Sequence, residues 1–189
     1  GGERRTEGPT RGIEDPVTGQ AIVAVPQCDA GDVDDAVDAA GEAFEGGWGD
    51  ATVRDRSKRL FEWADVLADH VEALTLLECL DCGKPITQAR GEVEGAIDTL
   101  EFYAGAVRAQ RGSEVPGGED LHLYTKQEPY GVVGGIVPWN YPLWAAAWKL
   151  GPALAAGNAC VLKPSSDTPL STIRAAQLSA GVFHDGVLN

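Results

Sequence analysis

The stretch from Glu128 to Pro169, EPYGVVGGIVPWNYPLWAAAWKLGPALAAGNACVLKPSSDTP, determines the fold that we expect for this chain. Its apolar runs at 132–137 and 159–163 are typical of strands buried on both faces. Between them the sequence predicts a sharp turn at 138–142, then a helix, then a stop at Gly157. Two strands joined through a helix form a parallel βαβ unit, so this stretch predicts an α/β fold.

Polar residues stand where both predicted strands end. Asn140 follows the first strand and Lys163 closes the second. Ligands of parallel sheets bind outside the carboxyl ends of the strands, which makes both residues candidate ligand contacts. From the residues alone, two other interpretations stay open. An Asn between prolines is more often part of a turn, and a Lys at a strand end is often a surface charge.

The same stretch resembles the cofactor-binding core of the NAD(P)-dependent aldehyde dehydrogenase superfamily. The family's Pro-Trp-Asn-(Phe/Tyr)-Pro signature is present at 138–142. Its Ala-Leu-Ala-x-Gly-Asn and Lys-Pro blocks follow at 153–158 and 163–164, with the family's usual spacing. The likeness extends from about Asp15 to Asn189. It implies the N-terminal part of a Rossmann-like parallel-sheet NAD(P)-binding domain, with helices on its faces and a protruding β-hairpin.

The resemblance also implies roles for single residues. Asn140 matches the family's asparagine that stabilises the oxyanion formed when a thiolate attacks the aldehyde. Lys163 matches the lysine that hydrogen-bonds the adenosine ribose, while Ile136 and Trp139 match positions that line the cofactor. No metal site is expected. The residues expected to contact the cofactor, NAD or NADP, are Ile136, Val137, Pro138, Trp139, Asn140, Lys163, Ser165 and Ser166.

One position departs from the family pattern. Most members that prefer NAD carry Glu three residues after the lysine, whereas this chain has Ser166. A carboxylate there would bind the ribose hydroxyls and repel the 2′-phosphate of NADP. We therefore expect the complete enzyme to tolerate NADP.

The family oxidises an aldehyde to a carboxylic acid through a thioester, and its nucleophile and general base lie downstream of the part matched here. The chain's own cysteines are poor candidates, since Cys160 lies in a predicted buried strand and Cys79 and Cys82 at a helix end. The CxxC pair could be redox-active or half of a zinc site, but a structural interpretation is favoured because no further ligands accompany it.

We therefore expect the N-terminal portion of an aldehyde dehydrogenase, inactive by itself. The alternative is a non-catalytic nucleotide-binding or oligomerisation module derived from the family. An incomplete parallel sheet would expose apolar surface, which disfavours the alternative.

The chain divides into four predicted parts. They are a disordered tail (1–12), an N-terminal hairpin with helices (13–111), an oligomerisation hairpin (112–131) and an incomplete βαβα core (132–189).

Within the second part, Asp32 is expected to cap a first helix. The length of the pattern from Thr52 to Cys82 predicts two abutting helices ended by Gly83. Lys84 is expected at a helix end or on the surface.

Composition limits the partners. The chain carries 29 Asp and Glu against 15 Lys and Arg, a net charge of −14, which argues against nucleic acid because phosphates would be repelled. The uncharged run at 131–148 contains Pro138, Asn140 and Pro142, which would break a lipid-embedded helix. No signal-peptide pattern is present at the start, so a cytoplasmic protein without a membrane partner is expected. Its expected partners are an aldehyde substrate and further copies of itself, joined through the 112–131 hairpin.

Overall fold

The structure, a computed structural model, describes residues 8–189. Its centre is the predicted βαβ unit, made of β5 (Val132–Ile136), α5 (Pro142–Ala155) and β6 (Ala159–Lys163). The two strands pair in parallel, with Val132 opposite Ala159 and Ile136 opposite Lys163. Gly157 has a φ of 95° between α5 and β6, which a residue with a Cβ rarely adopts, so the predicted glycine stop is confirmed. The expected α/β fold with a parallel sheet is likewise confirmed.

A third strand begins beside β6. After α6 (Leu170–Leu178), the backbone returns to the sheet, and Cys160 N–H donates to the carbonyl of Val187 at 2.8 Å. Leu162 N–H donates to the carbonyl of Asn189, also at 2.8 Å. Cys160 and Leu188 form a parallel bridge, which marks the beginning of a third parallel strand.

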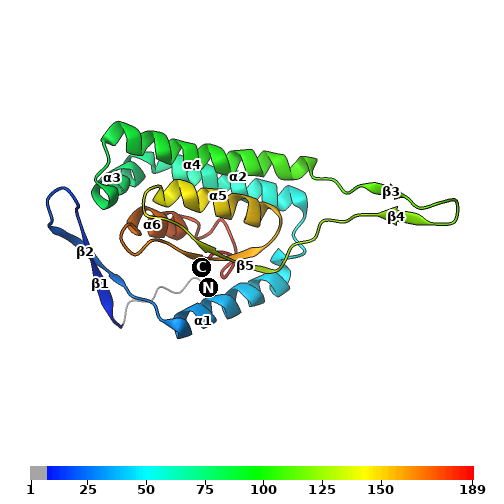
Figure 1. The fold of residues 1–189 in the computed structure, drawn as a ribbon, viewed down its shortest axis with the longest axis horizontal. Helices are drawn as coiled ribbons and strands as arrows, with labels where there is room; N and C mark the ends of the chain where they lie inside the picture. The colour runs from blue at the N-terminus through cyan, green and yellow to red at the C-terminus, as the bar shows by residue number, and fades with distance from the viewer. Residues whose placement is uncertain (1–7) are drawn as a thin grey trace.

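Helices cover both faces of this sheet (Figure 1). On one face lies α1 (Ala30–Ala43), which continues as the short π-helix η1 (Phe44–Trp48). On the other face lies α5, and α2 (Val53–Asp69) and α4 (Ile86–Ala106) pack against it as a further layer. Among residues 8–189, no helix combines the length and the apolar character needed to cross a lipid bilayer.

The predicted break within 52–82 is confirmed, because α3 (Val71–Cys82) follows α2 as a separate helix and packs against α4 and α6. Gly83 ends α3 in the left-handed conformation, with a φ of 69°. At the other end of the chain, β1 (Thr10–Glu14) and β2 (Ala21–Pro26) form an antiparallel ribbon.

A second ribbon projects away from the body of the molecule (Figure 1). After α4 and the 3-10 turn η2 (Val107–Ala109), the chain forms β3 (Glu114–Pro116) and β4 (His122–Tyr124), which pair antiparallel. Val115 lies opposite Leu123, and the side chains of both are exposed. The predicted protruding hairpin is therefore present.

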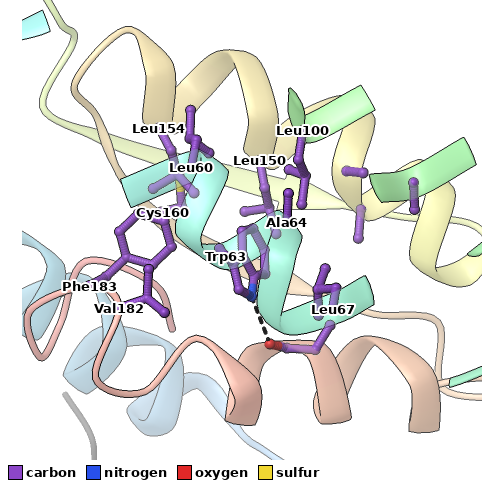
Figure 2. Close-up of a cluster of buried hydrophobic side chains, with 14 of the residues drawn as sticks. Leu60, Trp63, Ala64, Leu67, Leu100, Leu150, Leu154, Cys160, Val182 and Phe183 are labelled. Atoms are coloured by element: carbon purple, nitrogen blue, oxygen red, sulfur yellow. Dashed lines mark hydrogen bonds between the residues drawn. The ribbon is translucent and has the colours of Figure 1, made fainter. Parts of the chain in front are cut away.

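The core lies between α2, α4, α5 and the sheet (Figure 2). Trp63 is almost fully buried and its indole N–H donates to the carbonyl of Ala175 in α6 at 3.2 Å. The ring of Phe183 meets those of Trp48 and Trp63 edge-on, with centroids 5.6 and 5.7 Å apart. Burial of such large apolar side chains, roughly 1.5–3 kcal/mol each, is what holds the helix layers on the sheet.

Two expectations at the start of the chain are corrected. Residues 10–12, predicted to lie in the tail, belong to β1, because their backbone pairs with β2; residues 1–7 of that predicted tail lie outside the described residues. The first helix is capped by Asp29 rather than Asp32. Asp29 accepts from the Asp32 N–H, while the Asp32 carboxylate accepts from the Asp29 N–H, so the two form a reciprocal capping box.

Candidate functional site

The carboxyl ends of β5 and β6 bring the predicted cofactor residues together. Ile136 and Lys163 are partners in the strand register, and Val137 N–H extends the pairing by donating to the Lys163 carbonyl at 3.2 Å. Val137 itself is buried and anchors the turn. Ile136, in contrast, is the last residue of β5 and is 71% exposed, so its apolar side chain is open to solvent at the carboxyl edge of the sheet.

The loop after β6 gathers donors and acceptors at the same edge. The Lys163 ammonium donates to the Pro164 carbonyl at 3.0 Å and lies 3.4 Å from the Ser166 hydroxyl. Ser165 accepts from the Asp167 N–H at 3.3 Å. The loop is tied to β1 by an ion pair of 2.6 Å between Asp167 and Arg11.

The turn after β5 presents Asn140 to solvent. Pro138, Trp139 and Asn140 are all exposed, with Trp139 at 62%. The turn is nevertheless held in place, because the Trp139 carbonyl accepts from the buried Thr168 hydroxyl at 2.9 Å. Asn140 thus lies between that fixed carbonyl and the first turn of α5.

These residues fit a dinucleotide by their chemistry. An adenosine half needs apolar contact for the base and hydrogen-bond partners for the ribose hydroxyls. Ile136 and Trp139 offer exposed apolar surface, while the Lys163 ammonium and the Ser166 hydroxyl lie beside the end of the same strand pair. The arrangement agrees with the general location of ligands at the carboxyl ends of parallel strands.

The structure also contains a buried group of charges that the sequence analysis missed. Glu78 on α3 is 1% exposed, and both its oxygens are bonded. One oxygen accepts from the Leu143 N–H at 3.1 Å and from the Ser171 hydroxyl at 2.6 Å. The other accepts from Lys84 at 3.2 Å, and Lys84 is paired with Glu92 as well.

Of the two places expected for Lys84, a helix end or the surface, the first agrees with the structure, since Lys84 follows the last residues of α3, and the second is wrong. Its side chain is nearly buried, and its Nζ lies 5.2 Å from the centre of the Tyr141 ring. Burial by itself would lower the pKa of Lys84. The bond to Glu92 and the charge of Glu78 outweigh that effect, so that the pKa is raised and the ammonium stays charged.

A spacing in the sequence could have revealed these acids. Leu74 is fully buried on α3, and Glu78 and Asp81 follow it by four and seven residues, which places all three on one helical face. Asp81 Oδ2 accepts from the Leu170 N–H at 2.6 Å, at the beginning of α6. Burial raises the pKa of Asp81 to about 7.

Three of the four cysteines, of which Cys160 is buried and Cys79 and Cys82 are partly buried, have the properties expected of structural thiols. Burial raises the pKa values of Cys160 and Cys82 to about 12, and it also raises the pKa of Cys79. Thiols of this kind carry little thiolate near neutral pH, which agrees with the prediction that they are not nucleophiles. Within residues 8–189 no group of three His, Cys, Asp or Glu side chains is arranged to hold a metal ion.

Comparison with known proteins decides the family. The sequence model of the aldehyde dehydrogenase family matches residues 4–189. The chain belongs to the aldehyde dehydrogenase family. Curated relatives of this family member include an acetaldehyde dehydrogenase from Pseudomonas aeruginosa and a fluoroacetaldehyde dehydrogenase from Streptantibioticus cattleyicolor, 42% and 43% identical over 175 residues. Each alignment covers 92% of this chain and 34% of the relative.

Solved structures of the family match the fold closely. An aldehyde dehydrogenase mutant from Bacillus cereus gives a TM-score of 0.93 at 40% identity, covering 96% of this chain and 38% of the other. A betaine aldehyde dehydrogenase variant from Staphylococcus aureus, in complex with NAD+, gives 0.92 at 38% identity, covering 96% and 37%. This family member thus spans about a third of the length of the relatives that it matches.

Proposed function

We propose that this chain is the N-terminal, cofactor-binding portion of an NAD(P)-dependent aldehyde dehydrogenase, which oxidises an aldehyde to a carboxylic acid through a thioester. The observation that carries the proposal is the pairing of Ile136 with Lys163 at the sheet edge where the exposed Asn140 turn begins. Family membership supports the reaction class.

Each residue of the site has a specific proposed role. Lys163 and Ser166 hydrogen-bond the adenosine ribose, and Ile136 and Trp139 lie along the cofactor. A nicotinamide held there would supply the hydride acceptor for the oxidation. Asn140 donates its side-chain NH2 to the oxyanion that forms when the thiolate attacks the aldehyde, and such a donor must be oriented before the reaction begins.

The nucleophile and the general base are proposed to lie in sequence outside these 189 residues. The three cysteines with raised pKa values cannot supply a thiolate readily. Relatives that are about three times as long leave ample room for both groups.

We further propose that the protein is cytoplasmic and that copies of it associate through the hairpin at 112–131. The exposed apolar side chains of Val115, Leu121 and Leu123 support the association, because a two-stranded ribbon has little stability without further burial.

Kinetic assay of the protein carrying this chain, with the rest of its coding sequence, tests the proposal. Aldehyde-dependent reduction of NAD+ or NADP+ is expected for that protein and not for residues 1–189 alone. Absence of reduction across short, long and aromatic aldehydes would favour the alternative, a non-catalytic nucleotide-binding or oligomerisation module. Activity of residues 1–189 alone, after contaminants are excluded, would contradict the proposed location of the nucleophile.

A further inference from the structure

The first turn of α5, directly after Asn140, has no capping side chain from its own segment. Tyr141 at the N-cap makes no side-chain cap bond, and Pro142 has no N–H to donate. The first free donor is the Leu143 N–H, which is buried and donates to Glu78 Oε1 at 3.1 Å. The cap of α5 is therefore supplied from α3, 65 residues earlier in the chain.

The same is true of α6, the helix after the second strand. Pro169 at its N-cap makes no side-chain cap bond, and the Leu170 N–H donates to Asp81 at 2.6 Å. Ser171, in the first turn of α6, donates to the same Glu78 oxygen that accepts from Leu143. One helical face of α3 thus joins the beginnings of both helices that leave the sheet edge.

The Glu78 carboxylate can move little. A buried carboxylate is costly unless its oxygens are bonded, and here Lys84 holds the second oxygen at 3.2 Å. Lys84 is in turn fixed by Glu92, and it lies over the ring of Tyr141, the residue that follows Asn140. Lys84, in the connection between α3 and α4, therefore contacts the turn, while Glu78 on α3 contacts the helix.

Both sides of Asn140 are held by these elements. The Trp139 carbonyl, one residue before, accepts from Thr168 at 2.9 Å and from the Cys82 thiol at 3.5 Å. The Leu143 N–H, three residues after, is bonded to Glu78. The Asn140 side chain itself stays exposed, so its direction depends on the backbone that these bonds fix.

We propose that Glu78 is a positioning residue for the Asn140 turn: by capping α5 from α3, it sets the direction of the Asn140 amide. The inference rests on the proposed function for its catalytic consequence, although not for its structural one. Misplacement of a reacting group by about 1 Å can cost roughly 10²-fold in rate, so a remote cap is enough to matter.

The structural consequence is measured on this chain by NMR of its tryptophan indole N–H groups, with the Trp139 signal assigned through Trp139→Phe. Glu78→Ala is expected to shift or broaden the Trp139 signal, because the turn loses its anchor. The signals of Trp48 and Trp63, whose indoles donate to core carbonyls, should stay in place and report an intact fold.

Two further variants separate positioning from general damage. Glu78→Gln keeps an oxygen that can accept from the Leu143 N–H. Its Trp139 signal should therefore lie much closer to that of the parent than the signal of Glu78→Ala does. Glu72→Ala is the matched control, since Glu72 lies on the same helix, is 77% exposed and is paired with Arg90. It should leave the Trp139 signal unchanged.

The proposal is overturned if Glu78→Ala leaves the Trp139 signal unmoved in a folded chain. Should that variant lose the Trp48 and Trp63 signals, Glu78→Asp decides instead, because its shorter side chain keeps the charge beside Lys84 but withdraws the oxygen from the Leu143 N–H. A shifted Trp139 signal then supports the proposal and an unmoved one contradicts it.

The kinetic consequence is measured on the protein carrying this chain with the rest of its coding sequence. Glu78→Ala should lower kcat about tenfold or more while the Kd of the cofactor stays within about twofold, since only the donor's orientation is lost. A protein without aldehyde-dependent activity would refute the proposed function, but the Trp139 result would still decide the positioning role of Glu78.

Discussion

Ser166 is the residue that most directly bears on the choice between NAD and NADP. Its hydroxyl lies 3.4 Å from the Lys163 ammonium, so a group added at position 166 meets whatever Lys163 binds. Ser166→Glu should weaken NADP binding about tenfold or more and leave NAD binding similar or tighter, because a carboxylate repels the 2′-phosphate. Isothermal titration calorimetry checks this by measuring the Kd of NAD and of NADP for the complete enzyme and for its Ser166→Glu variant. Equal NADP affinity in the two proteins would refute the role of Ser166.

Asp81 should make the stability of the chain depend on pH. Burial raises its pKa from 3.8 to about 7, so the folded state holds a proton that the unfolded state releases. The stabilisation is complete below about pH 4 and is lost as the pH rises through 7. The Asp81→Asn variant has no group at position 81 that titrates in this range. The free energy of unfolding of the parent should therefore fall by on the order of 2–4 kcal/mol relative to that of the variant as the pH rises from 4 to above 7. Urea unfolding of both proteins at several pH values measures this change. A difference in the free energy of unfolding that stays constant with pH would contradict the raised pKa of Asp81.

At the scale of elements, the contact between α4 and α5 offers a matched pair of substitutions. A Cβ at Gly91 would meet no atom within 4 Å, whereas one at Gly95 would lie 2.8 Å from the Trp144 ring. That ring cannot withdraw freely, because its N–H donates to Thr99 at 3.1 Å and it packs against Trp148.

Gly91→Ala should therefore raise the free energy of unfolding by about 0.5–1 kcal/mol through helix propensity. Gly95→Ala should lower it by about 1–3 kcal/mol through overpacking. Thermal unfolding of the two variants and the parent measures the change in Tm that each substitution causes. Changes of the same sign in both variants would show that α4 and α5 do not pack as described.

The elements also differ in how well the sequence predicts them. The βαβ unit follows from its apolar runs, its prolines and Gly157, and β6 was predicted to the residue. The buried face of α3 was not predicted, because Glu78 and Asp81 occupy it and acidic side chains are normally exposed to solvent. Their partners Leu143 and Leu170 lie 65 and 89 residues away, a proximity that no local pattern encodes.

At the scale of the whole molecule, the hairpin of β3 and β4 projects from the body (Figure 1). Its apolar side chains Val115, Leu121 and Leu123 are exposed. Changing the facing residues Val115 and Leu123 to Thr keeps strand propensity but removes apolar contact area. The double variant should therefore form smaller assemblies, with a lower molecular mass by light scattering than the parent protein. Val17→Thr, in the exposed turn between β1 and β2, is the control and should leave the mass unchanged. An unchanged mass in the double variant would contradict association through the hairpin.

The most direct test of the whole account is the effect of Asn140→Ala on aldehyde oxidation by the protein carrying this chain. Loss of the oxyanion donor should lower kcat by roughly 10²–10³-fold. The Kd of the cofactor should change by no more than about twofold, because the residues proposed to bind the adenosine half are untouched. That pattern is the predicted result. An unchanged kcat, or a loss explained entirely by weaker cofactor binding, would contradict the role of Asn140 and with it the proposed site.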